Sequence, residues 1–276
     1  MGKKVYFYIQ VLSIDVVLGA CASNLFLAKL VGVNLGVLDV LSLAFAVWII
    51  YTFDHLLDAR AIPHSAHTDR HAFHQRNFRF LSVCIALLTF IESFIVFYLP
   101  TDLIFNGLVL GGLVGGYFLM LQFFKGAIPY LKEFSIASIY ILGISLSVFT
   151  YNDFHSDSFL WLFLSLFWGM AIVNLLLFSY MDSETDSKDT QASIVELLGK
   201  FKISILIGFL LSILLIVTLI SIFFSEKITI EFMLVLVMQA MLWGVFLLRE
   251  RNRQINLLRA LADGVFMMPL LLVLNY

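Results

Sequence analysis

Long, unbroken apolar segments are the feature that most restricts the fold of this chain. A helix needs about 20 apolar residues to span a bilayer, and 61% of the 276 residues here are hydrophobic. Runs of this length leave little chain for a soluble domain. We predict nine membrane-spanning helices, at roughly residues 5–30, 37–57, 79–99, 103–124, 134–150, 157–181, 203–224, 228–248 and 257–275. The sequence therefore predicts an all-α integral membrane protein, with one polytopic domain over residues 1–276.

The positions of Lys and Arg predict how these helices are oriented. If the amino terminus is cytoplasmic, nine spans place every Lys and Arg except Lys29 and Lys227 on the cytoplasmic side. Cytoplasmic loops of membrane proteins carry such an excess of positive charge. We therefore predict a cytoplasmic N-terminus, a C-terminus outside, and cytoplasmic cap loops after helices 2, 4 and 6. The net charge of −2 predicts no nucleic-acid partner, and nothing implies a protein partner.

Two pairs of aspartates with one spacing lie at equivalent places in this arrangement. Asp54 and Asp58 end the second predicted helix, and Asp182 and Asp186 end the sixth. Carboxylates at i and i+4 share one face of a helix. Both helices run from outside to inside, so both pairs are expected at the same cytoplasmic face.

The four carboxylates predict a metal and a phosphate ligand. Carboxylates in a membrane helix are costly unless something binds them, and four facing one cavity would repel each other. Mg²⁺ ions between them would remove this repulsion, and carboxylate-held Mg²⁺ commonly carries a phosphate group. Metal bound to a diphosphate stabilises it as a leaving group. An apolar, aromatic-rich cavity would exclude water and stabilise an allylic carbocation.

Two polar residues within predicted spans are further candidates for substrate contact. Asn174 lies eight residues before Asp182 and points the same way from deeper in the sixth helix. Asp15 lies within the first predicted span, where an ionisable residue suggests a function. It would orient or deprotonate an acceptor, or pair with a buried cation. Asp263 is expected to pair with Arg259, one turn earlier.

Four histidines between the second and third predicted helices leave two interpretations open. His64, His67, His71 and His74 would share one face if this segment were helical. Such spacing is compatible with a zinc site. Alternatively, a loop at a phosphate-binding mouth uses histidines as plain hydrogen-bond donors.

Three short motifs resemble those of the UbiA-type intramembrane prenyltransferases. Asp54-His-Leu-Leu-Asp58-Ala-Arg60 resembles the first aspartate motif of that family, and Asp182-Ser-Glu-Thr-Asp186 resembles the second. Ile128-Pro129-Tyr130-Leu131-Lys132 is similar to the tyrosine–lysine element before the family's fifth helix. The family also has nine helices with both aspartate motifs at cytoplasmic ends, so the resemblance extends over nearly the whole chain.

The resemblance implies a function and a set of site residues. Asp54, Asp58, Asp182 and Asp186 would hold Mg²⁺ and be catalytic. Lys132 and Arg70 would meet diphosphate oxygens, Tyr130 would donate a hydrogen bond to them, and Arg60 is a further candidate for that role. The implied activity is Mg²⁺-dependent transfer of a prenyl group from a polyprenyl diphosphate to an unidentified acceptor. The implied location is the bacterial inner membrane, with the active site facing the cytoplasm.

The chain departs from the family pattern in its first motif. The family usually has Asn-Asp three to four residues before the aspartate matched by Asp54, and Ile50 and Tyr51 occupy those positions here. In the second motif, Thr185 replaces an Asp. These changes are compatible with altered metal stoichiometry, another acceptor, or lost catalysis. Two alternatives therefore stay open: a membrane terpene cyclase on the same scaffold, and a non-catalytic or transport homologue.

Overall fold

The computed structural model is helical throughout its described residues, which are 2–123, 129–152, 158–189, 193–224, 229–250 and 255–274, and no strand occurs in these ranges. Its helices are α1 (Gly2–Val11), α2 (Ile14–Leu30), α3 (Val37–Ala61), α4 (Asp69–Arg76), α5 (Phe78–Ile95), η1 (Val96–Tyr98), α6 (Thr101–Phe123), α7 (Pro129–Tyr151), α8 (Ser158–Lys188), α9 (Ile194–Leu198), α10 (Lys200–Phe224), α11 (Ile230–Leu248), α12 (Ile255–Gly264), η3 (Val265–Met267) and α13 (Leu270–Val273). The predicted all-α fold class is confirmed.

Seven helices in the described ranges are long and apolar enough to cross a membrane. They are α3, α5 continued by η1, α6, α7, α8, α10 and α11. α1 and α2 form an eighth candidate if the bent pair is counted as one span. These helices are those of a multi-pass membrane protein. The ninth predicted helix, 257–275, is divided into α12, η3 and α13, so nine spans and their orientation remain a prediction.

The bend between α1 and α2 is the main departure from the predicted helices. The two axes differ by 70°, and Ser13 between them has a left-handed backbone conformation that a continuous α-helix excludes. Asp15 follows in the first turn of α2, where its Oδ1 accepts the backbone N–H of Val16 at 3.0 Å. A carboxylate is favourable at a helix N-terminus. The continuous helix predicted over 5–30 is therefore wrong, and Asp15 stands at a helix start.

α8 is the central helix of the bundle. Of its most apolar 18-residue window, 61% is buried inside the protein, against 6% for the window of α5. Phe163 and Phe167, one turn apart on α8, are fully buried against Phe26 of α2. Phe163 meets its ring edge to face at a centroid distance of 5.7 Å, and Phe167 stacks on it at 5.8 Å. α8 therefore holds the second Asp pair on the best-packed helix, whereas α5 presents most of its apolar side chains outward.

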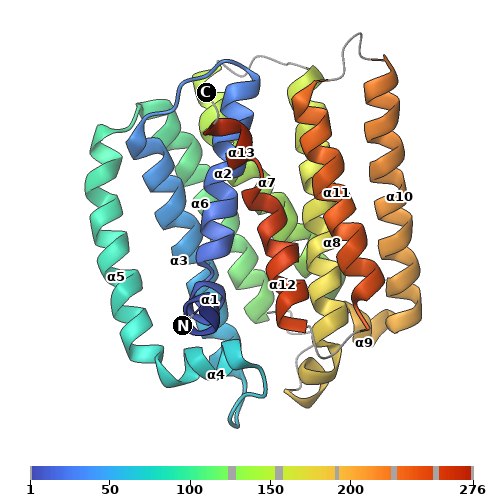
Figure 1. Ribbon diagram of the computed structural model, residues 1–276. Helices are drawn as coiled ribbons and strands as arrows, with labels where there is room; N and C mark the ends of the chain where they lie inside the picture. Colours follow the sequence, from blue (N-terminus) through green and yellow to red (C-terminus); the bar gives the residue numbers. More distant parts are fainter. Residues whose placement is uncertain are drawn as a thin grey trace.

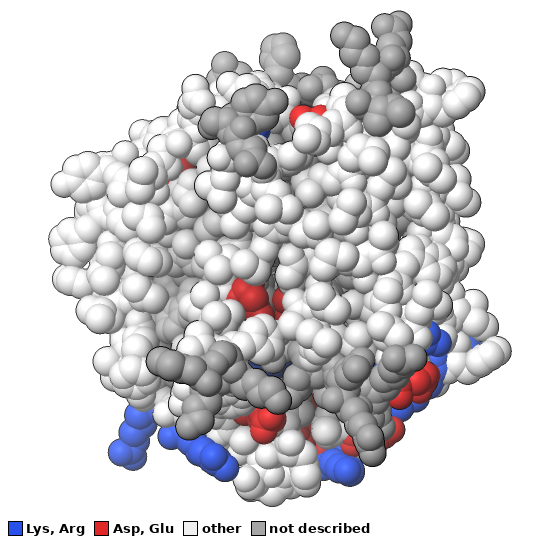
Figure 2. All heavy atoms as spheres, in the orientation of Figure 1, with Lys and Arg blue, Asp and Glu red and all other residues white. Residues whose placement is uncertain are grey.

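One end of the bundle carries the elements that cover both Asp pairs. α4 and α9 both lie at the lower end in Figure 1, and they follow the carboxyl ends of α3 and α8 in the chain. Figure 2 shows that most visible Lys and Arg side chains gather at this lower end. The segments after the second and sixth predicted helices therefore lie at one end of the bundle, and the cytoplasmic cap loops remain a prediction. Residues 124–128, after the fourth, lie outside the described residues.

Substitution of a glycine on α2 tests how closely the last helical segments pack against the bundle. A Cβ added at Gly19 would lie 2.9 Å from Cβ of Phe266, whereas Gly112 on α6 has nothing within 4 Å. We predict that Gly19→Ala lowers the free energy of unfolding by about 1–3 kcal/mol through overpacking. Gly112→Ala should leave it unchanged or raise it, because alanine favours helix. Thermal unfolding in detergent, followed by circular dichroism, measures both. Equal midpoints for the two variants would contradict this close contact.

Candidate functional site

A cavity of about 400 Å³ gathers most of the predicted site residues. We call it the polar cavity, and its walls come from α1, α2, α3, α4, α7, α8, α12 and the segments between them. The predicted residues that line it are Asp15, Asp54, Asp58, Arg70, Lys132, Asn174, Asp182 and Asp186. Residues more than 100 positions apart in the sequence therefore meet in one place, as the two aspartate motifs predicted.

The first Asp pair contributes one ion-paired and one unpaired carboxylate. Asp54 and Asp58 lie one turn apart on α3 and both face the polar cavity. Asp58 Oδ2 accepts a hydrogen bond from Nζ of Lys132 on α7 at 3.3 Å. Within the described parts of the chain Asp54 forms no ion pair, so it is available to a ligand.

The second Asp pair has the same division. Asp182 is 7% exposed and forms an ion pair with Arg259 of α12. Asp186 lines the polar cavity without an ion pair among the described residues. Ser193, which follows this motif, also lines the cavity and caps α9 by accepting the backbone N–H of Glu196 at 3.2 Å. Each pair therefore combines a neutralised carboxylate with an unpaired one.

α4 brings a cation to the same cavity. Thr68 caps the helix by accepting the backbone N–H of His71 at 3.3 Å, which places Arg70 in the first turn. Arg70 lines the polar cavity, and its buried Nε has no hydrogen-bond partner among the described residues. A buried guanidinium donor without a partner is costly, so this arginine is suited to an anionic ligand.

His71 lies beside Arg70 and is 4% exposed. Burial, with the neighbouring guanidinium of Arg70, lowers the pKa of His71 from 6.5 to about 4. The imidazole is therefore neutral at pH 7 and can donate or accept a hydrogen bond inside the cavity.

Asn174 and Asp15 lie deeper in the polar cavity, as predicted for Asn174. Nδ2 of Asn174 lies 3.4 Å from Oδ1 of Asp263 on α12, a long hydrogen bond. The predicted pairing of Asp263 with Arg259 is not formed, because Arg259 turns to Asp182 instead. A neutral amide therefore contacts the Asp263 carboxylate at the inner end of the cavity.

One predicted residue, Arg60, is not brought into the polar cavity. Arg60 is exposed in the last turn of α3 and lines no part of it. It follows Asp58 by two residues, which is about 200° around the helix, so the two side chains leave opposite faces. The substrate role predicted for Arg60 is thus not supported. The side chain of Tyr130 lies outside the described residues.

Sequence reasoning missed several residues of the polar cavity. Arg259 was interpreted only as a cytoplasmic charge and as a partner of Asp263, and Glu133 was not considered at all. Glu133 is buried beside Lys132 and accepts a hydrogen bond from Ser179 of α8 at 2.9 Å. The position of Glu133 directly after the tyrosine–lysine element is a sequence signal that could have identified it as a site residue. The pairing of Arg259 with Asp182 had no such signal in the sequence, because the two residues lie on different helices.

The four clustered histidines separate into different environments. α4 begins only at Asp69, so His64 and His67 precede it and cannot share a helix face with the other two. His71 lines the polar cavity, and the ring of His74 lies 5.2 Å from that of His55 on α3. A four-histidine face, as the helical interpretation required, is therefore not formed.

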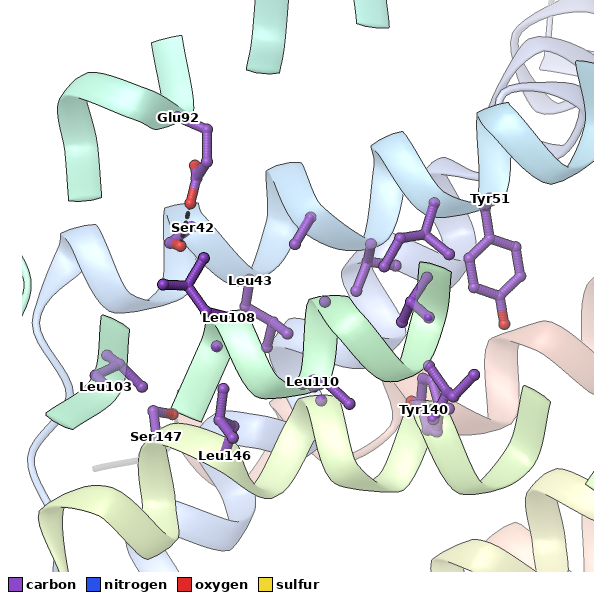
Figure 3. Close-up of a pocket in the computed structure, with 18 of the residues that line it drawn as sticks. Ser42, Leu43, Tyr51, Glu92, Leu103, Leu108, Leu110, Tyr140, Leu146 and Ser147 are labelled. Carbon is purple, nitrogen blue, oxygen red and sulfur yellow. Dashed lines mark hydrogen bonds between the residues drawn. The ribbon is translucent and has the colours of Figure 1, made fainter. Parts of the chain in front are cut away.

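A second cavity, of about 340 Å³, adjoins the polar one. We call it the apolar cavity. It lies between α3, α5, α6 and α7, and its lining is mostly aliphatic, including Leu103, Leu110 and Leu146 (Figure 3). Tyr51, Asp54, Ile136 and Tyr140 line both cavities. The two spaces therefore meet at the first Asp motif.

The two ends of the apolar cavity differ in chemistry. Figure 3 shows Tyr51 and Tyr140 at one end, beside the polar cavity. At the other end Ser42 of α3 donates a hydrogen bond to Glu92 of α5, and Ser147 lies nearby. Ile50 and Tyr51, which replace the Asn-Asp of the resembled family, both line this cavity.

The donor set of the polar cavity fits a hard divalent cation. Mg²⁺ prefers carboxylate oxygens and is often bound through one or two of them together with a substrate phosphate. Asp54 and Asp186 can act as such ligands without breaking an ion pair. Lys132 and Arg70 supply positive charge on the same walls as these carboxylates.

Comparison of the chain with family models, curated proteins and solved structures finds no match.

The lowered pKa of His71 predicts an acid-sensitive site. The folded state binds fewer protons than the unfolded state between pH 6.5 and about 4. The contribution of neutral His71 to stability is thus present above pH 6.5 and is lost as the pH falls through that window. We predict that the unfolding midpoint in detergent drops between pH 7 and 4.5, and drops less in His71→Asn. Parallel pH profiles for the two proteins would refute this assignment.

Proposed function

We propose that this protein is a Mg²⁺-dependent intramembrane prenyltransferase, which ionises a polyprenyl diphosphate and transfers the prenyl group to an acceptor. The observation that carries the proposal is the junction of the two cavities at Tyr51 and Asp54. A space with carboxylates and cations continues there into a space lined by aliphatic side chains. An amphiphile with an anionic head and a long apolar chain matches both at once.

The head of the donor would lie in the polar cavity. Asp54, Asp58, Asp182 and Asp186 would hold Mg²⁺, which supplies charge neutralisation to the leaving diphosphate. Arg70 and Lys132 would bind the diphosphate oxygens and fix their orientation. The unpartnered Nε of Arg70 supports its role, whereas Lys132 would exchange its contact with Asp58 at 3.3 Å for the diphosphate.

The prenyl chain would lie in the apolar cavity, with its first carbon at the junction. The carbon–oxygen bond breaks and its electron pair leaves with the diphosphate. Tyr51 and Tyr140 would face the resulting allylic cation with their rings, and the aliphatic walls would exclude water. A nucleophilic atom of the acceptor then bonds to the carbon, and the proton it loses would go to a carboxylate such as Asp15.

The finer topology belongs to the same proposal. The distribution of Lys and Arg supports nine spans with the polar cavity facing the cytoplasm, and the bacterial inner membrane would be the location. The acceptor is not identified by any feature of the two cavities. The cyclase alternative uses the same ionisation without an acceptor, and the organic products distinguish the two.

Release of diphosphate tests the proposal. Protein in nanodiscs would be given geranyl, farnesyl, geranylgeranyl and longer allylic diphosphates with Mg²⁺ or EDTA, plus a lipid extract as acceptor source. We predict Mg²⁺-dependent release that Asp54→Asn and Asp182→Asn each reduce by about 100-fold or more, because metal stabilisation of the leaving group contributes several kcal/mol.

Asp102→Asn is the matched control, since Asp102 is an exposed carboxylate in the first turn of α6 outside both cavities. It should retain full release. Absence of release with every donor, from protein shown to be folded, would reject the enzyme and favour the non-catalytic homologue, with Ile50 and Tyr51 as the changes to reverse.

Donor length tests the apolar cavity separately. Gly111 lines that cavity with nothing within 4 Å of an added Cβ, while its neighbour Gly112 is equally open but lies outside it. We predict that Gly111→Leu reduces release from geranylgeranyl and longer donors by about tenfold or more relative to geranyl diphosphate. The physical reason is that each displaced methylene costs about 0.8 kcal/mol. Gly112→Leu should not change the preference. Equal losses for all donors would mean that the prenyl chain of the donor does not lie in the apolar cavity.

A further inference from the structure

Three potential metal ligands meet at the edge of the polar cavity, where the segment before α4 touches the end of α8. They are His64, His67 and Asp189, which we call the histidine–aspartate cluster. One ligand atom from each lies within 4.8 Å of the others. The two imidazole rings are 5.3 Å apart, and Nδ1 of His67 lies 2.6 Å from Oδ1 of Asp189. Two elements 122 residues apart in the chain are joined at this point.

Asp189 is held as a fixed ligand. Its side chain is only 1% exposed, and its backbone N–H donates to Thr185 of α8 at 2.9 Å. Both of its carboxylate oxygens lie 3.2 Å from the backbone N–H of His67. Burial raises the pKa of Asp189, but the hydrogen bonds from the His67 side chain and backbone outweigh this and lower it. The carboxylate is therefore ionised at neutral pH and oriented towards the imidazoles.

The imidazoles leave one side of the cluster open. The side chains of His64 and His67 are 42% and 49% exposed, so solvent reaches them. Nδ1 of His64 lies 4.0 Å from Asp189 Oδ1 and 3.1 Å from the carbonyl oxygen of Ser65. A metal would replace that local contact and the hydrogen bond between Nδ1 of His67 and Oδ1 of Asp189. Tetrahedral ligands about 2.0–2.1 Å from a zinc ion lie about 3.3 Å apart, which the cluster reaches by side-chain rotation.

We propose that His64, His67 and Asp189 form a binding site for a transition-metal ion of the zinc class, with water as the remaining ligand. Two imidazoles and one carboxylate suit Zn²⁺, whereas Mg²⁺ prefers oxygen ligands alone. The site is therefore chemically distinct from the four aspartates of the polar cavity. It does not rest on the proposed prenyl transfer.

The metal would fix the segment that leads into α4. His67 itself lines the polar cavity, and the next residue, Thr68, caps α4. Coordination would tie this entry to the carboxyl end of α8, three residues beyond Asp186. The ion would thus hold the segment before α4 against the end of α8, and so fix the position of Arg70 at the cavity.

Zinc binding in the absence of substrate tests the inference. Full-length protein in nanodiscs, stripped with EDTA and dialysed, would be titrated with Zn²⁺ against a chromophoric chelator. We expect one equivalent of tight binding, which excess Mg²⁺ does not displace and which raises the unfolding midpoint. The double variant His64→Ala/His67→Ala and the variant Asp189→Asn should each weaken it by at least about tenfold, since even outer partners of metal ligands contribute that much.

Two control variants separate this site from adventitious binding. Glu196→Gln removes an exposed carboxylate on α9, and His155→Ala removes a histidine from another part of the sequence. Both should bind Zn²⁺ as the unmodified protein does. The ligand histidines are half exposed, so their loss should leave the fold intact, which circular dichroism checks. Absence of stoichiometric binding, or binding unchanged in the double variant, would overturn the proposal and leave the cluster as a hydrogen-bonded contact.

Discussion

The compensation of buried charge at one end of an apolar bundle is the constraint on which the site depends. An ionised carboxylate in a low-dielectric interior needs a partner or a ligand. Asp182 forms an ion pair with Arg259 of α12, and Asp58 forms one with Lys132 of α7. These contacts join α8 to α12 and α3 to α7 at the level of the polar cavity. For the better-buried pair, Asp182 and Arg259, removal of one partner would leave the other charge uncompensated, which is more costly than the pair itself.

The arrangement of the apolar cavity follows from the same constraint. Ile50 and Tyr51 stand where the resembled family has Asn-Asp, so this chain has one fewer carboxylate to compensate at the junction. In its place are an aliphatic and an aromatic wall shared with the apolar cavity.

Local sequence patterns predicted the helices and the two Asp pairs, because each depends on residues within a few turns. Asp54 and Asp58 share a face by spacing alone, and Asn174 follows Asp182 on the same basis. Pairing between helices is not encoded in this way, so Arg259 was assigned to Asp263, its neighbour one turn away, rather than to Asp182. Hydropathy does not predict the helix break at Ser13, because the residues on both sides of it are apolar. Arg60 does not line the polar cavity, because it follows Asp58 by two residues and so leaves another face of α3.

The entry to α4 links these observations. Arg70 reaches the polar cavity only because α4 starts at Asp69, and that start depends on the Thr68 cap. The residue before the cap, His67, is anchored through its backbone N–H and its ring to Asp189, just past the end of α8. The second Asp motif and the cation opposite it are therefore positioned by one contact between two segments that are distant in sequence. Whatever strengthens that contact also fixes the position of α4, and with it Arg70, relative to Asp186 and the end of α8.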